Sequence, residues 1–295
     1  MPQRWIPIIN YNPAHWFVGG LRLVGRAIRR MWGRDVMLYT GGVSFYAMLA
    51  GFPALAILVS VYGLLATPEE ASIQAARLAT LLPDSARVLF AAELQRLAVT
   101  PLSVLSTQSG VAVLVSLYAA HRGVKALIAG LTFINHEEGT YSFVKINLVA
   151  LMVFLAGLGL ILVTSVAFLI VRLLVVSVDP DAVHHSLWLF DQWGWSSLGV
   201  SLGLILIYRY VMSARPLDWR AAVIGGVTGA AVSLAASWAC ALYVDRVARL
   251  GATYGSIAAV VVCLIWISWN VNAVFFGGAL ASETALLLDP PAPRG

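Results

Sequence analysis

The hydrophobic positions of this chain fall in long continuous runs that short polar segments separate. A helix of roughly 20 mostly apolar residues crosses the hydrocarbon core of a bilayer, which is about 30 Å thick. The runs lack the alternating pattern of barrel strands, so the sequence predicts helices. The expected fold is an all-α, polytopic membrane bundle of six transmembrane helices, at about residues 36–66, 104–128, 144–177, 188–213, 220–244 and 252–282.

Three segments flank or interrupt the predicted single membrane domain, which extends over residues 35–288. Residues 1–34 precede the first span, and residues 289–295 form a short tail. Residues 67–103 carry two short amphipathic patterns, neither of which is long or apolar enough to cross a bilayer. We expect these two patterns to form helices that lie on the membrane surface.

The segment before the first span has the pattern of an interfacial helix with one basic side. Leu23, Ala27 and Met31 follow one helical face, whereas the arginines follow another. The basic face consists of Arg22, Arg26, Arg29 and Arg30. Each arginine near an anionic leaflet contributes about 1 kcal/mol of attraction. The same cluster is also explained as a topogenic signal without lipid specificity, and the pattern alone leaves both interpretations open.

Composition and charge support a membrane location and suggest an orientation. The chain is 60% hydrophobic and 11% charged, with a mean hydropathy of +0.85. Soluble domains carry about 25% charged residues, so this chain cannot cover a water-facing surface. Arginines precede the first span, whereas the loops after the first and third spans are rich in Asp and Glu. Because positive loops stay inside, both termini are expected to be cytoplasmic.

The two cysteines, Cys240 and Cys263, predict neither a disulfide framework nor a metal site. Both lie inside apolar runs, far from other residues at ligand spacing, and they are interpreted as small packing residues. The first residues lack the pattern of a cleavable signal peptide, so the first span is expected to direct insertion.

A stripe of small side chains predicts close packing of the fifth span. Gly225, Gly229, Ser233 and Ser237 recur every four residues along one helical face. Small residues allow close backbone approach, which drives helix association in lipid. Gly199 and Gly203 of the fourth span repeat this spacing, and the sequence therefore suggests them as the partner surface.

Two asparagines, Asn270 and Asn272, are predicted near the middle of the sixth span. Buried amides need hydrogen-bond partners, so these side chains are expected to face protein or a wet cavity rather than lipid. One interpretation is interhelical hydrogen bonding. The other is a polar wall of a translocation path.

A basic cluster interrupts the apolar second span, where His121, Arg122 and Lys125 lie within five positions. His121 and Lys125 share a helical face, with Arg122 beside it. In one interpretation these side chains only extend toward the inner boundary of the membrane. In the other they bind a phosphate or carboxylate at headgroup depth. The full set of expected anion-binding residues is Arg26, Arg29, Arg30, His121, Arg122, Lys125 and Arg209.

Residues 41–58, GGVSFYAMLAGFPALAIL, resemble the first span of the YihY/BrkB family. Later stretches, including residues 241–269 and FGGALASE at 276–283, resemble its carboxyl-terminal half. The positions that carry the resemblance are Phe45, Tyr46, Phe52, Pro53, Tyr254, Gly255 and Trp266. The chain departs from the family pattern at Leu280, where relatives carry an acid, and Glu283 one turn later is a candidate substitute.

The resemblance implies an integral inner-membrane protein of the cell envelope, in a family without an agreed activity. Members were once mislabelled ribonuclease BN, and one branch is linked to the export of lipopolysaccharide lipids. Two functions remain open: a transporter or flippase of an anionic amphiphile or lipid, or a non-transporting scaffold for an envelope complex. Expected partners are membrane lipids, other membrane proteins or a second copy of the chain.

Enzymatic activity is not expected, because nuclease chemistry needs clustered carboxylates or an acid/base pair and the acids here are scattered through loops. Asp179, Asp181, His184 and His185 form a patch rich in metal-ligand residue types. Its Asp-Pro-Asp sequence is interpreted first as a turn, and a metal site is the alternative. No cofactor and no nucleic-acid partner are expected either.

Overall fold

The computed structural model describes residues 13–32, 36–65, 102–135, 142–178, 192–213, 215–246 and 258–288. Within these residues the regular secondary structure is entirely helical. The helices are α1 (Pro13–Trp32), α2 (Val36–Leu65), α5 (Leu102–Ile134), α6 (Phe143–Val178), α9 (Gln192–Tyr210), α10 (Trp219–Arg246) and α12 (Ala258–Leu288). The predicted surface helices of 67–103, the 179–185 patch, and Tyr254 and Gly255 lie outside the described residues.

Each of the six predicted apolar segments forms a helix, which confirms the all-α class. The largest differences are at the ends of α5 and α12, both of which extend six residues beyond the predicted ends at 128 and 282. Leu131 and Ile134 on the extension of α5 are fully buried, so tertiary packing holds this last part of the helix. The sequence pattern missed it because hydropathy does not report that burial.

Three described helices are long and apolar enough to cross a membrane. They contain the candidate spans Phe143–Phe168 in α6, Trp219–Tyr243 in α10 and Val260–Leu288 in α12. A shorter apolar stretch covers Val36–Gly51 in α2. These helices fit a membrane protein, whereas the count of six spans stays a prediction.

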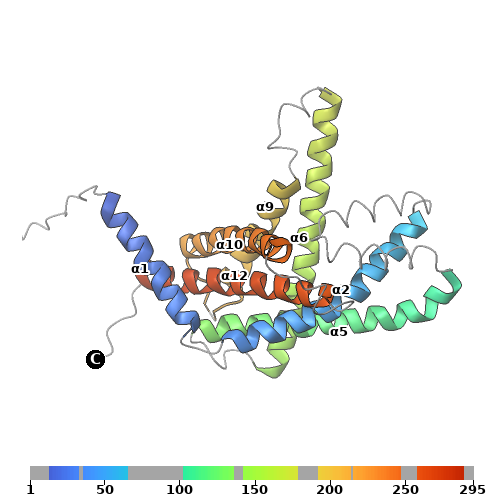
Figure 1. The fold of residues 1–295 in the computed structure, drawn as a ribbon, viewed down its shortest axis with the longest axis horizontal. Coiled ribbons are helices and arrows are strands. Elements are labelled where there is room, and N and C mark those ends of the chain that lie inside the picture. The colour runs from blue at the N-terminus through green and yellow to red at the C-terminus, as the bar shows by residue number, and fades with distance from the viewer. Residues whose placement is uncertain are drawn as a thin grey trace, which may run out of the picture.

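Helices α2 and α5 pack antiparallel, as alternate crossing of a membrane requires. Gly130 of α5 lies against Tyr39 near the start of α2, while Gly123 lies against Tyr46 further along α2. Figure 1 shows α2 and α5 side by side, with α10 and α12 forming a second pair. The start of α2 therefore lies near the end of α5.

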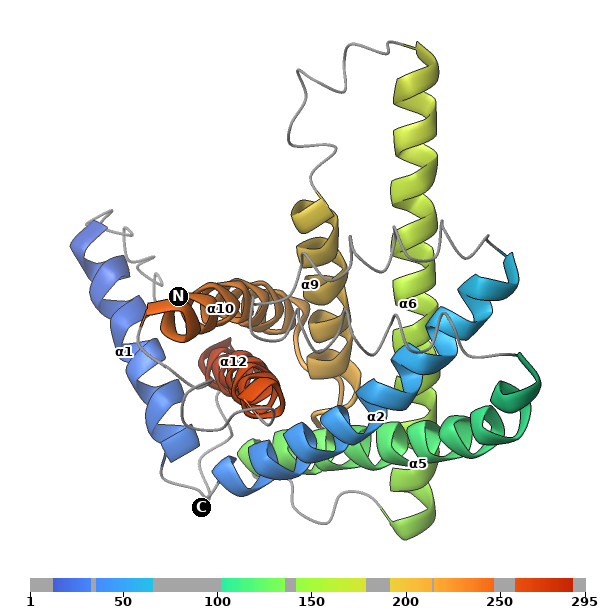
Figure 2. The same ribbon diagram turned by 45° about the vertical axis from the view of Figure 1, so that its right-hand side comes forward.

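α6 and α9 run steeply across the other helices (Figures 1 and 2). Gly199 and Gly203 of α9 face Thr164 and Leu160 of α6. The expectation that these two glycines meet the small-residue stripe of α10 is therefore wrong. Their spacing marks a close helix contact, but the contact is with α6.

The small-residue stripe of α10 packs on α12 instead. A Cβ atom added at Gly225 would lie 2.6 Å from the carbonyl oxygen of Gly277, so the two backbones nearly touch. Tyr208 of α9 is fully buried beside this contact and donates a hydrogen bond of 2.6 Å to the carbonyl of Val274. This contact is part of the main core cluster, which also includes buried residues of α1, α2 and α5.

α1 packs against α12 through its apolar face. Ala27 is fully buried, and Leu23 and Met31 pack against the core. The sequence predicted that this face lies in the membrane interface, but it is covered by protein. Exposed apolar side chains remain on the helix, including Leu21 and Trp32.

Candidate functional site

The seven basic residues expected to bind anions fall into sets with different partners. On α1, Arg26 and Arg30 form ion pairs with Glu283 of α12, at 3.4 Å and 3.0 Å from Nε to the carboxylate. The side chains of Arg30 and Glu283 are each only 12% exposed. This carboxylate neutralises part of the charge of α1, whereas Arg29 is exposed.

The ion pairs belong to a polar network that joins the ends of three helices. Arg30 also donates a hydrogen bond to Ser282 Oγ, which in turn donates to Asn135 Oδ1 over 2.6 Å. Leu280, at the position where the family resemblance implies an acid, is 4% exposed and belongs to the hydrophobic core. Glu283 is thus the acid at this end of α12. We call Arg26, Arg30, Asn135, Ser282 and Glu283 the ionic end.

Arg209, at the end of α9, is held by the connection to α10. Its Nη1 donates to the carbonyl of Leu217, and its guanidinium lies 4.1 Å from the ring centre of Trp219. The Leu217 N–H donates back to the Arg209 carbonyl over 3.1 Å. These contacts stabilise the turn that connects α9 to α10, so Arg209 has a structural role there.

His121 and Lys125 meet on one side chain of the next helix. Lys125 Nζ donates to Asn147 Oδ1 over 2.8 Å, and His121 Nε2 lies 3.3 Å from the same oxygen. Asn147 stands one turn after the start of α6 and donates through Nδ2 to the Phe143 carbonyl. The shared face that the sequence predicted for His121 and Lys125 thus faces the amino end of α6.

Arg122 points toward aromatic side chains. Its Nε donates to Tyr118 Oη over 3.1 Å, and its guanidinium lies 5.6 Å and 6.0 Å from the ring centres of Tyr118 and Tyr46. Lys125 Nζ lies 5.3 Å from the centre of the Phe143 ring. We call His121, Arg122 and Lys125 the α5 cluster. Within the described part of the chain, the side chains of this cluster contact neutral groups.

Both asparagines of α12 form hydrogen bonds between helices. Asn270 Oδ1 accepts from Ser233 and Ser237 of α10, and Trp266 Nε1 donates to Ser237 over 3.1 Å. Asn272 Oδ1 accepts from Thr40 Oγ1 of α2 over 3.1 Å. Two serines of the small-residue stripe therefore serve polar contacts as well as close packing.

We predict that the contact between Thr40 and Asn272 contributes about 1 kcal/mol to folding, the usual scale of interhelical hydrogen bonds in membranes. A double-mutant cycle with Thr40→Val and Asn272→Leu, followed by unfolding in mixed micelles, measures this coupling. Strictly additive effects of the two substitutions would show that the bond contributes nothing.

The residues of the family resemblance are only partly described. Phe45 is 58% exposed, Tyr46 borders the α5 cluster, and Trp266 bonds to α10. Phe52 and Pro53 lie within α2, but their side chains are outside the described set. Tyr46 is thus the described motif residue nearest to a group of cations.

The described residues contain no group of three His, Cys, Asp or Glu side chains that could hold a metal ion. Cys240 is buried and Cys263 half-buried, and both are free thiols. Cys240 packs with Val262 and Ile265 in a small apolar cluster, which agrees with the packing role predicted for it from the sequence.

Sequence reasoning missed three partners that decide what the cations do. Asn147 contacts both His121 and Lys125, and Tyr118 accepts a hydrogen bond from Arg122. Ser282 accepts a hydrogen bond from Arg30 at the ionic end. Only Tyr118 had a local signal, since it lies four residues before Arg122 on the same helical face. The other two partners lie on different helices.

Comparison with known proteins gives one family match. The family model described as Virulence factor BrkB matches residues 27–292. No solved structure matches the chain.

Two curated relatives are similar to parts of the chain. The putative ribonuclease-like protein YfkH of Bacillus subtilis (strain 168) is 25% identical over 172 residues, which cover 57% of this chain and 62% of the relative. A UPF0761 membrane protein of Paraburkholderia xenovorans (strain LB400) is 37% identical over 95 residues, which cover 30% of this chain and 21% of the relative. The chain thus spans less than two thirds of either relative.

Proposed function

The chain belongs to the virulence factor BrkB family, and from this premise we propose that it is a transporter or flippase of an anionic amphiphile, most simply an acidic lipid. The family includes membrane proteins of the UPF0761 kind, and the apolar helices α6, α10 and α12 fit a multi-pass membrane location. The proposal that the chain transports a lipid across the inner membrane goes beyond this membrane location, and it rests on the α5 cluster.

The charge of the α5 cluster carries the proposal. Asn147 and Tyr118 satisfy hydrogen bonds of Lys125 and Arg122 but bring no negative charge. The ion pairs of Arg26 and Arg30 with Glu283 lie on another part of the structure. Cations in a medium of low dielectric constant need a counter-charge. A phosphate or carboxylate headgroup supplies it, with charge-assisted hydrogen bonds.

The position of the cluster suits a headgroup. The candidate span of α6 begins at Phe143, one turn before Asn147, so this contact lies at the edge of an apolar helix. Helix amino ends carry a positive partial charge that favours anions. The amino end of α6 therefore adds to the attraction of the three side chains for a headgroup at the membrane boundary.

The proposed topology has six spans with both termini in the cytosol. Antiparallel packing of α2 on α5 and the arginines before α2 support this arrangement. The ionic end and the start of α10 then face the cytosol, and an amphiphile reaches the α5 cluster from the inner leaflet.

Transport is tested with purified protein in liposomes that contain fluorescent phosphatidylglycerol, with and without an imposed membrane potential. We expect the protein to accelerate movement of this lipid between leaflets. Neutralising the site with Arg122→Gln and Lys125→Gln should slow it at least about tenfold, because charge-assisted hydrogen bonds contribute about 1.5 to 3 kcal/mol each.

The matched control removes two other exposed cations, Arg215 and Arg220, by substitution with glutamine. This variant should transport within about twofold of the wild-type rate, because neither side chain belongs to the α5 cluster. Movement no faster than in protein-free liposomes, or equal rates in the two double variants, would contradict the proposed function.

A scaffold function has less support. It would use the small-residue face of α10 to hold partners, but Gly225 and Gly229 already pack against Gly277 within the chain. We also propose that the chain is not a nuclease. The word ribonuclease in the name of one relative belongs to that protein, and the scattered acids of this sequence argue against such chemistry here.

A further inference from the structure

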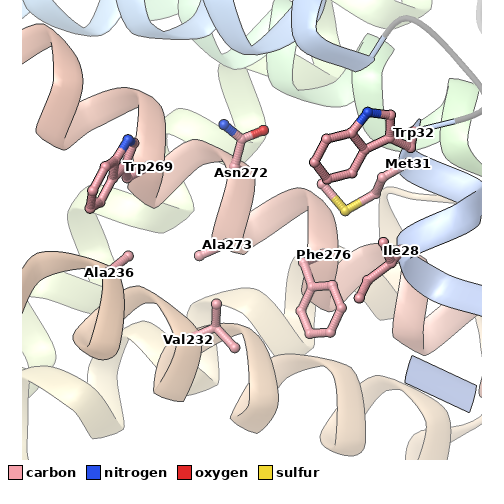
Figure 3. A pocket seen from close by; sticks show the side chains of 9 residues that line it. All are labelled: Ile28, Met31, Trp32, Val232, Ala236, Trp269, Asn272, Ala273 and Phe276. Carbon is pink, nitrogen blue, oxygen red and sulfur yellow. The ribbon is translucent and has the colours of Figure 1, made fainter. Parts of the chain in front are cut away.

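A cavity of about 310 Å³ lies between α1, α10 and α12. Figure 3 shows Ile28 and Trp32 entering it from α1, Ala236 from α10, and Trp269 and Phe276 from α12. It is separate from the α5 cluster, because none of the three cluster residues lines it. Ligand sites in proteins start at about this size and are mostly apolar.

The residues that line the cavity favour an apolar ligand. Asn272 is the one amide in the lining, and its oxygen already accepts from Thr40 while its nitrogen donates to the Ser268 carbonyl. The remaining lining residues are aliphatic or aromatic, apart from Met31, which has an apolar thioether side chain. A water molecule needs two to four polar partners, which such walls do not offer. A hydrocarbon chain needs none.

The rim of the cavity carries exposed aromatic and basic groups. Trp32 is 81% exposed, as expected of an indole at a membrane interface, and Trp269 is 36% exposed. Arg29 is exposed and stands three residues before Trp32, so the two side chains are neighbours on the surface of α1. Arg22 lies on the same exposed side of the helix. An apolar cavity thus adjoins a basic surface.

We propose that this cavity binds one acyl chain of an acidic phospholipid, whose headgroup lies on Arg29 and Arg22. The positive charge beside the opening matches the anionic headgroup, and the cavity matches the chain. The lipid contacts all three helices and so holds α1 on the core from the side opposite to the ionic end. This site is independent of transport at the α5 cluster.

The site is tested by photo-crosslinking the full-length protein in bilayers with phosphatidylglycerol that carries a diazirine on one acyl chain. Cross-links should concentrate in peptides covering residues 28–32 and 269–276. Unlabelled phosphatidylglycerol should displace the probe at least tenfold better than phosphatidylcholine with the same chains. Arg29→Gln should reduce that preference.

Filling the cavity provides a matched pair of variants. Ala236→Trp places a large side chain in the cavity, whereas Ala235→Trp places it on the neighbouring exposed position. The first should lower cross-linking at least tenfold, and the second should change it less than twofold. Val232→Phe fills the cavity from a second position and replaces Ala236→Trp if that variant does not fold.

Three results of the cross-linking experiments would overturn the assignment. They are cross-links spread evenly over exposed apolar helices such as α6, equal effects of the two tryptophan variants, and equal displacement by both lipids. Native mass spectra should show a retained phospholipid, and a second copy of the chain bound in its place would also overturn it. Because the α5 cluster is intact in these variants, a failure here leaves the transport assay of Arg122→Gln and Lys125→Gln unaffected.

Discussion

Replacing Gly277 by leucine is expected to prevent stable folding. A Cβ atom at this position would lie 2.7 Å from the Gly225 carbonyl oxygen, 2.7 Å from Tyr208 Oη and 2.9 Å from the Gly229 Cα atom. Two of these neighbours are backbone, so they cannot rotate away. Overpacking of a core costs about 1 to 3 kcal/mol where side chains can adjust. Because the backbone atoms of Gly225 and Gly229 cannot adjust in this way, the free energy of unfolding should fall by about 3 kcal/mol or more.

The control is Gly157→Leu on α6, where an added Cβ has no neighbour within 4 Å. This variant should unfold within about 0.5 kcal/mol of the wild type, because surface changes have small effects. Unfolding in mixed micelles, read by tryptophan fluorescence, compares the two. If Gly277→Leu were as stable as Gly157→Leu, the close packing of α10 on α12 would be wrong.

Replacing Glu283 by glutamine is expected to have the next largest effect. The substitution keeps the size of the side chain but leaves Arg26 and Arg30 without their carboxylate. Breaking a buried ion pair by removing one partner costs about 3 to 5 kcal/mol. Arg26 is 49% exposed, so solvent compensates part of its loss, and about 3 kcal/mol is the expected decrease in unfolding free energy.

The matched test repeats Glu283→Gln in a chain that already carries Arg26→Gln and Arg30→Gln. There the substitution should cost less than about 1 kcal/mol, because no cation is left unpaired. Equal costs in the two backgrounds would show that the ion pairs do not stabilise the docking of α1.

The sequence predicts the helices well because their main cause is local. A run of apolar residues long enough to cross a bilayer forms a helix whatever its neighbours, since lipid offers the backbone no hydrogen bonds. The extension of α5 to Ile134 depends instead on burial of Leu131 against other helices. A helix end that depends on tertiary contacts cannot be predicted from the hydropathy of the sequence.

Helix partners are less predictable than helices. The spacing of Gly225 and Gly229 shows which face of α10 is small, but many helices offer a matching surface, and the chosen one is α12. Likewise, the sequence places Arg30 on a basic face but gives no sign that Glu283 faces it. Arg26, Arg29, Arg30 and Arg209, which were expected to belong to the anion site, thus have different surroundings from the three residues of the α5 cluster.

The central claim of this account is that the α5 cluster binds an anionic headgroup. Its most direct test is equilibrium binding of short-chain phosphatidylglycerol to purified protein, compared with phosphatidylcholine of the same chain length. Arg122→Gln with Lys125→Gln is predicted to weaken binding at one site by at least about tenfold, whereas Arg215→Gln with Arg220→Gln should leave it unchanged. Identical binding by the wild type and the α5 variant would contradict the claim.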